Sequence, residues 1–123
     1  MSYVSGFLLA VPNAKKDAYR QMAEATWAIF ADHGCLAIQE NWGIDVPDGK
    51  VTSFPMAVRR EDGETVVFSW LKWPDKETCD RGWDAMMKDP RMAEMDDMPF
   101  DGMRMMWGGF EPLFEANARG GSA

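Results

Sequence analysis

Apolar residues recur along the chain with two different periods, and this pattern predicts both strands and helices. Residues 3–11 are rich in β-branched and aromatic side chains and end at Pro12, which is typical of a strand. Residues 36–43 alternate between apolar and polar positions, and residues 65–73 are almost entirely β-branched or aromatic. Both segments are therefore predicted to be strands as well.

The first helical pattern covers residues 14–33. Counted from Tyr19, apolar or small side chains recur at i, i+3, i+4, i+7 and i+11, so that they share one helical face. Asn13 is the predicted N-cap, because its side chain can accept a hydrogen bond from a free backbone N–H. Gly34 is the predicted end, since glycine readily adopts the left-handed conformation that follows many helices.

A second helical pattern runs from a predicted N-cap at Asp75 to about residue 88. The side chains predicted to form its buried stripe are Cys79, Trp83, Met86 and Met87. Asp89 and Pro90 are predicted to begin a short helix directly afterwards, because Asp is a good N-cap and Pro suits the first helical position.

Weaker signals occupy the rest of the chain. Residues 54–60 are predicted to form a short edge strand, because Pro55 lacks the N–H group that a central strand requires. Asp62 and Gly63 are typical of a tight hairpin turn. Residues 103–110 are the predicted last strand.

The predicted order of the main elements is β-α-β-β-α-β, with residues 54–60 as an additional edge strand. This order predicts an α+β fold, with a ferredoxin-like antiparallel sheet that carries its two main helices on one face. We expect a single domain over residues 1–113. Residues 114–123, which include Gly120, Gly121 and Ser122, are expected to form a disordered C-terminal tail.

The predicted sheet carries apolar residues on both faces. Along residues 65–73, one face has Val66, Phe68 and Trp70, and the other has Val67, Leu71 and Trp73. Two helices can cover only one face, which measures roughly 440 Å² in a four-stranded sheet. Covering the other face contributes on the order of 10 kcal/mol before association costs, so we expect a homodimer formed through that face.

The net charge limits the expected partners and compartment. The 123 residues include 13 Lys or Arg and 20 Asp or Glu, which gives a net charge of −7. This charge disfavours nucleic acid and anionic membrane surfaces as partners. The chain also has no apolar run near the ~20 residues of a membrane span and no features of a secretory signal, so a cytoplasmic location is expected. In that reducing compartment Cys35 and Cys79 are expected to be buried thiols without a disulfide.

Several segments are similar to one known family. They are residues 1–4 with Gly6 and Phe7, 40–43, 45–52, 67–70 with Trp73 and Pro74, 89–92, 99–102, 104–105 and 108–110. On these residues the chain resembles the YbaA-like family of small uncharacterised bacterial proteins, within the dimeric α/β-barrel superfamily. The resemblance implies a homodimer whose two sheets pack face to face as a barrel. It implies no particular activity, because that superfamily includes cofactor-independent monooxygenases, haem-degrading enzymes, dehalogenating lyases and plain ligand binders.

Two residues are candidates for catalysis. His33 lies at the predicted end of the first helix, where it serves either as a base in a cleft or as a favourable charge at the helix C-terminus. Glu40 shares a predicted strand face with Leu36 and Ile38. It is expected either to form an ion pair with Arg104 or to be a desolvated acid with a raised pKa.

Aromatic and methionine side chains are abundant, with six Trp, seven Phe and eleven Met. They are expected to fill the core and the dimer interface, or to line an adaptable pocket for a flat or lipophilic ligand. The residues predicted to contact such a ligand are Trp42, Trp70, Trp83, Arg104 and Trp107. No metal site and no cofactor are expected, because the chain has one histidine and no glycine-rich phosphate loop before a helix.

The leading hypothesis is a homodimer with a small-molecule cleft between the sheet and its helices, bordered by Glu40, His33 and Arg104. Its chemistry would be monooxygenase-like oxidation without a cofactor, or proton transfer, on an aromatic or lipophilic substrate. The alternative is a non-catalytic dimeric module for binding or sensing. An open cavity that reaches Glu40 or His33 favours the first hypothesis, and a sealed cleft with a Glu40–Arg104 pair favours the second.

Overall fold

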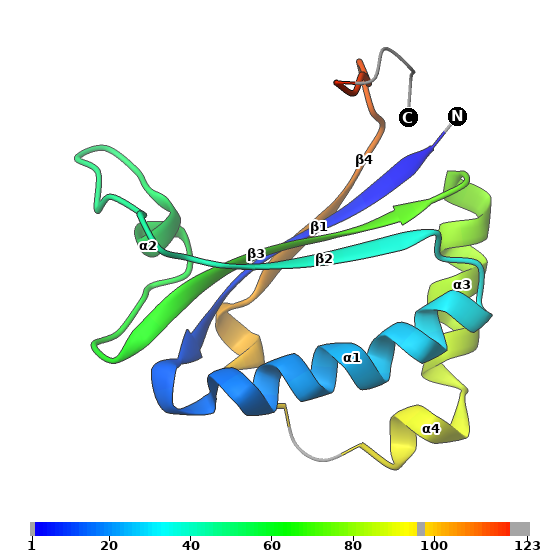
Figure 1. The fold of residues 1–123 in the computed structure, drawn as a ribbon, viewed down its shortest axis with the longest axis horizontal. Helices are drawn as coiled ribbons and strands as arrows, with labels where there is room; N and C mark the ends of the chain where they lie inside the picture. The colour runs from blue at the N-terminus through cyan, green and yellow to red at the C-terminus, as the bar shows by residue number, and fades with distance from the viewer. Residues whose placement is uncertain (1, 96–97, 119–123) are drawn as a thin grey trace.

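The structure is a computed structural model that describes residues 2–95 and 98–118 of the chain. The described residues contain four strands: β1 (Tyr3–Pro12), β2 (Ala37–Trp42), β3 (Glu64–Trp73) and β4 (Met106–Phe110). They form one antiparallel sheet in the order β2-β3-β1-β4, so that β1 and β3 are central and β2 and β4 are edge strands (Figure 1).

Two longer helices, α1 (Lys16–Asp32) and α3 (Lys76–Met87), lie on the same side of this sheet (Figure 1). Shorter helical segments connect the main elements: η1 (Asn13–Lys15), α2 (Phe54–Ala57), α4 (Pro90–Ala93) and η2 (Gly102–Arg104). The predicted α+β class is confirmed by this combination of helices with an antiparallel sheet.

The predicted apolar face of α1 is confirmed. Its buried residues are Tyr19, Ala23, Thr26, Ile29 and Phe30. The predicted cap was wrong, because Asn13 accepts a hydrogen bond from the Thr65 hydroxyl and the helix begins after η1, with no side-chain cap at Lys15. Gly34 ends the helix with φ +99°, as predicted, and a Cβ there would lie 2.6 Å from Thr78 Cγ2.

The predicted start of α3 is also confirmed. The Asp75 side chain accepts a hydrogen bond of 2.7 Å from the backbone N–H of Thr78. Asp89 caps α4 in the same way, through a 2.9 Å bond from the backbone N–H of Arg91. Of the predicted buried stripe of α3, Cys79 and Met86 are buried and Trp83 is partly buried against the core. Met87 was predicted wrongly, because it faces solvent.

Residues 54–60 do not form the predicted edge strand. The Ser53 hydroxyl accepts a 3.0 Å hydrogen bond from the backbone N–H of Met56, and Pro55 occupies the first turn of α2. A proline that lacks an N–H group fits the first turn of a helix as well as it fits an edge strand, and here the serine cap favours the helix.

The last strand is shorter than predicted. Asp101 accepts a 3.0 Å hydrogen bond from the backbone N–H of Met103, and this contact caps the short helix η2. β4 therefore begins at Met106 instead of residue 103.

The core lies between the sheet and the two long helices. Leu9 and Val67 pack against Tyr19 of α1. Trp73 is fully buried beside α3, and its indole Nε1 donates a 3.1 Å hydrogen bond to the hydroxyl of Ser5. This packing shows that the even-numbered positions of β3 face away from α1 and α3.

The opposite side of the sheet is only partly covered. Near α2, Val58 packs with Ala10 and Val66, and all three are buried. The largest remaining apolar side chains on this side are Leu8, Phe68, Trp70, Met106 and Phe110. We refer to these five residues as the open face.

The chain beyond β4 is described to residue 118. The carboxylate of Glu115 lies 3.2 Å from the ammonium group of Lys72 and accepts a 2.8 Å hydrogen bond from Ser2. The predicted domain end at residue 113 and the predicted disorder of 114–123 stay predictions, and Gly120, Gly121 and Ser122 lie outside the described residues. Among the described helices, none combines the length and the apolar character needed to cross a membrane.

Candidate functional site

A groove of about 390 Å³ opens between α1 and the edge strand β2. We refer to it as the Glu40 groove, because the carboxyl group of Glu40 lies in an otherwise mainly apolar wall. The apolar and aromatic side chains of this wall are Tyr19, Ala23, Trp27, Ile38, Trp42 and Val67. The predicted strand face of Ile38, Glu40 and Trp42 therefore lines one continuous surface.

The carboxyl group of Glu40 is held from the helix side. Tyr19 Oη donates a 2.7 Å hydrogen bond to Glu40 Oε1, and Ser69 lies directly across from Glu40 on β3. Burial of the carboxyl raises the pKa of Glu40, although hydrogen bonds from the Tyr19 and Ser69 hydroxyls oppose this shift. Burial and the neighbouring Glu40 carboxyl together raise the pKa of Tyr19, which keeps the phenol protonated as a donor.

Lys16 and Arg20 line the groove together with the acidic residues Asp17 and Glu24, but within the described part of the chain neither cation forms an ion pair with Glu40. Among the described residues, Glu40 takes part in no ion pair, whereas Arg20 is paired with Glu24 on the helix surface. Lys16 Nζ lies 5.1 Å from the centre of the Trp42 ring. A carboxyl with a raised pKa, an apolar wall and access to solvent has the properties of a general acid or base.

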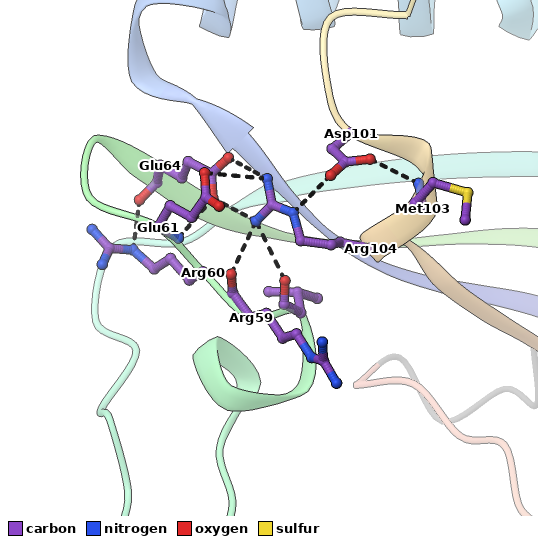
Figure 2. A network of polar contacts seen from close by, with 8 residues as sticks. Arg59, Arg60, Glu61, Glu64, Asp101, Met103 and Arg104 are labelled. Carbon is purple, nitrogen blue, oxygen red and sulfur yellow. Dashed lines mark hydrogen bonds and ion pairs between the residues drawn. The ribbon is translucent and has the colours of Figure 1, made fainter.

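Arg104 does not pair with Glu40, which corrects one of the predicted alternatives. Its two terminal nitrogens bind both carboxylate oxygens of Glu64 at 2.8 and 2.7 Å, and its Nε donates to Asp101 at 3.0 Å (Figure 2). It also donates to the carbonyl oxygen of Arg59 at 3.0 Å. This arginine therefore joins η2, the start of β3 and the turn after α2, and it lies outside the lining of the Glu40 groove.

The Arg104 network also sets the ionisation of its carboxylates. Hydrogen bonds from Arg104 lower the pKa of Glu64 and of Asp101. Arg59 has φ +50°, in the left-handed region, and its carbonyl is held by the same guanidinium. These contacts indicate a role for Arg104 in fixing the turn that follows α2.

His33 is placed at the C-terminal end of α1, outside the lining of the Glu40 groove. Its Nε2 lies 3.0 Å from Asp89 Oδ2. Hydrogen bonds from Arg91 and then from His33 lower the pKa of Asp89. Arg91 also contacts Asp32 at 2.8 Å, so His33 belongs to a polar cluster that connects α1 with the start of α4.

A second hollow of about 620 Å³ lies between α3 and the edge strand β4. We refer to it as the β4 cavity. Trp83 and Trp107, two of the predicted ligand contacts, line this cavity. Trp42 lines the Glu40 groove, and Trp70 lies on the open face. The predicted site residues are therefore distributed over two separate hollows, the open face, the Arg104 network and the polar cluster of His33.

Comparison with known proteins places the chain in a family. Residues 2–102 match the model of a family described as "Protein of unknown function (DUF1428)". The chain belongs to this family. The "Uncharacterized protein YbaA" of Escherichia coli (strain K12) is 54% identical over 116 residues, which cover 94% of this chain and 99% of that protein. YbaA of Shigella flexneri has the same identity and coverage, so the resemblance to YbaA-like proteins is confirmed.

One match among solved structures is the de novo designed protein Foldit4. It has a TM-score of 0.46 and 10% sequence identity, and the match covers 91% of this chain and 99% of that chain.

In this DUF1428 protein, sequence reasoning identified Glu40 but missed its partner. Tyr19 was assigned only to the apolar face of the first helix. The signal that would have revealed the pair is general: a buried tyrosine usually needs a hydrogen-bond partner for its hydroxyl, so a polar group is expected on the facing strand.

The DUF1428 protein has two cysteines, and both are free and buried, as predicted. Within residues 2–95 and 98–118, no group of three or more His, Cys, Asp or Glu side chains is placed to hold a metal ion.

Proposed function

We propose that the Glu40 groove binds a small lipophilic or aromatic molecule and that Glu40 exchanges a proton with it. The observation that carries this proposal is the Glu40 carboxyl, which lies in an open apolar groove, without a cationic partner among the described residues, and has a raised pKa. Apolar hollows with a few polar groups are typical small-molecule sites.

The reaction that these groups support directly is proton transfer. Ionised Glu40 accepts a proton from an acidic C–H or O–H group of the bound molecule, and Tyr19 holds the carboxylate through its hydroxyl. In a monooxygenase-like reaction without a cofactor, Glu40 has the same role as base, and the deprotonated substrate itself supplies the electrons to dioxygen. The apolar wall of the groove, with Trp27 and Trp42, favours a substrate with a flat or greasy body.

The alternative is a non-catalytic module that binds or senses a ligand. In that case the hydrogen bond between Tyr19 and Glu40 orients the ligand without proton exchange. The substitution Glu40→Gln distinguishes the two functions, because the amide side chain retains a hydrogen-bond acceptor but cannot exchange a proton at neutral pH.

We also propose that the domain is a ferredoxin-like unit of a face-to-face dimeric barrel. The strand order β2-β3-β1-β4 and the placement of both long helices on one side support this arrangement. Phe68 and Phe110 on the open face are 48% and 59% exposed, which is costly for large apolar side chains in a monomer.

Two projecting segments extend the open face. Leu113 and Phe114 are 100% and 84% exposed beyond β4, and Ile44 and Val51 are each 95% exposed beyond β2. Figure 1 shows both segments on the side of the sheet opposite α1 and α3. The sheet face alone supplies roughly 440 Å², about half of the ~800 Å² per partner of a standard interface, and these segments supply further apolar area.

A thermal-shift screen of the purified protein tests the ligand-binding proposal. The probes are flavins, haem, quinones and polyphenols, because a ligand that binds only the folded state raises Tm by mass action. We expect at least one compound to raise the Tm of the wild type by an amount that depends on pH. In Glu40→Gln this pH dependence should be absent. His33→Ala, outside the groove, should keep that pH dependence. A shift of equal size and pH dependence in Glu40→Gln would support the non-catalytic module, and the absence of any shift would contradict both.

A further inference from the structure

The β4 cavity differs in chemistry from the Glu40 groove. Its wall is formed mainly by aromatic and methionine side chains: Tyr3, Phe7, Trp83, Met87, Met105 and Trp107. Within the described part of the chain, no Lys, Arg or His side chain lines it. Asp80 is a lining residue, and its carboxylate lies 2.6 Å from the ammonium group of Lys76. Such a wall disfavours an anionic ligand and favours an uncharged one.

The cavity opens on the helix side of the sheet, which the second copy of the proposed dimer would not cover. Met87 on α3 and Trp107 on the helix side of β4 both line it, and they are 77% and 75% exposed. Aromatic rings such as Trp107 provide flat faces on which another ring can stack, and methionine side chains adapt to its outline. Gly109 contributes to the shape of the cavity, because a Cβ at this position would overlap the Tyr3 hydroxyl.

A hydrogen-bond donor is available inside the cavity. Ser5 Oγ accepts a 3.1 Å hydrogen bond from Trp73 Nε1, so the hydroxyl hydrogen of Ser5 is free to point elsewhere. Its other partner is Cys79 Sγ at 3.5 Å, and burial raises the pKa of Cys79, which keeps it a neutral thiol. A thiol sulfur is a weak acceptor. A carbonyl oxygen in the cavity would accept this hydrogen more strongly.

We propose that the β4 cavity is a binding site for an uncharged, planar aromatic molecule that carries a carbonyl group. Its rings lie against Trp107 and Trp83, and its carbonyl oxygen accepts a hydrogen bond from Ser5. The volume of about 620 Å³ is in the range of small-molecule pockets. The site lies at the opposite edge of the sheet from Glu40, so it does not depend on the function proposed for that groove.

The test uses Prodan, a neutral naphthyl ketone whose emission shifts to the blue in an apolar site. We expect saturable binding to the wild-type protein. Met87→Glu should weaken it about tenfold, because a carboxylate at the opening must be desolvated by the ligand. Met103→Glu is the matched control, since Met103 is 93% exposed and lies outside the cavity, and it should leave the affinity unchanged. Glu40→Gln should also bind Prodan normally, whatever the outcome for the Glu40 groove.

Two further measurements identify the position and the chemistry of the bound ring. Prodan should slow the modification of Cys79 by methyl methanethiosulfonate, relative to Cys35, as measured by mass spectrometry of the peptides. In displacement of Prodan, 2-acetylnaphthalene should be the strongest competitor, followed by 2-ethylnaphthalene, and 2-naphthoate the weakest. The proposal is overturned by equal affinities of the two methionine variants, by unchanged modification of Cys79, or by a preference for the naphthoate anion. Absence of saturable binding would overturn it as well.

Discussion

Tyr19 on α1 and Glu40 on β2 are joined by a 2.7 Å hydrogen bond from the phenol hydroxyl to a carboxylate oxygen. This contact connects a long helix with an edge strand across the Glu40 groove. The same contact keeps the carboxyl oriented inside an apolar wall, where its ionised form is poorly solvated. The properties of the proposed site follow from that position.

Replacing Glu40 by Gln should change stability in a pH-dependent way. Burial raises the pKa of Glu40 in the folded state, so the ionised form is penalised by folding. The penalty is absent below the ordinary pKa of a glutamate and is complete once the pH exceeds the raised value. We therefore expect Glu40→Gln to raise Tm at pH 8 and to match the wild type near pH 4, as measured by circular dichroism.

The control for this experiment is Glu77→Gln, because Glu77 lies on the exposed surface of α3 and its ion pair among the described residues is a long one, with Arg81 at 3.7 Å. It should follow the wild-type pH profile closely. A lower Tm for Glu40→Gln than for the wild type at pH 8 would contradict the desolvated state of the Glu40 carboxyl.

Replacing Arg104 by Gln should strongly destabilise the fold. The variant leaves the Glu64 carboxylate, 8% exposed, without its bidentate partner, and releases the carbonyl oxygen of Arg59. We expect a clearly lower urea midpoint at pH 7. Arg20→Gln removes an ion pair whose side chains are both 64% exposed, and it should change the midpoint little.

The same variant should alter the response to acid. Arg104 lowers the pKa of Glu64 and Asp101, so the stability from these groups is present above their unfolded pKa and is lost as the pH falls through the lowered values. The difference between wild type and Arg104→Gln should therefore shrink between pH 7 and pH 2. A constant difference over this range would argue against the Arg104 network.

Gly82→Ala should destabilise the helix-to-sheet packing. A Cβ at Gly82 would lie 2.6 Å from Trp73 Cζ3 and 2.9 Å from the His33 carbonyl oxygen, so it forces a fully buried side chain to move. Overpacking of this kind costs about 1–3 kcal/mol. Gly102→Ala has no heavy atom within 4 Å of the added Cβ, and it should change the free energy of unfolding by less than about 0.5 kcal/mol. Urea unfolding gives the free energy of unfolding of both variants, and equal values would show that α3 shifts freely to accommodate the added Cβ.

Sedimentation equilibrium tests the proposed dimer. The chain mass is 13.9 kDa, so we expect a species of twice this mass at micromolar concentration. Phe68→Lys should yield the monomer, because a charge in the open face opposes association. Met87→Lys, on the helix side, should remain dimeric. Wild-type protein that sediments only at the mass of one chain would contradict the face-to-face arrangement.

The sequence was sufficient for the elements whose apolar period is regular. α1, α3, β1 and β3 were predicted because burial on one face determines which positions are apolar. Residues 54–60 were assigned wrongly, since Pro55 is compatible with both an edge strand and a first helical turn. The hydrogen bond from Met56 N to the Ser53 hydroxyl decides between them, and composition alone does not reveal it.

The candidate site was only partly predictable for a different reason. The strand period placed Glu40 and Trp42 on one face correctly, because alternation is a local property of the chain. The choice of partner is not local. Arg104 has Asp101 and Glu64 within reach after folding, and it pairs with them instead of Glu40. Which carboxylate meets which cation depends on the strand order and on the turn after α2.

The most direct test of the central claim is the titration of the Glu40 carboxyl carbon by NMR, with the assignment made from Glu40→Gln. We predict a pKa above the ordinary glutamate range, because burial outweighs the hydrogen bonds from Tyr19 and Ser69. In Tyr19→Phe, which removes one of those bonds, the pKa should rise further. A pKa within or below the ordinary range in the wild-type protein would contradict the proposed role of Glu40 as a proton-exchanging group.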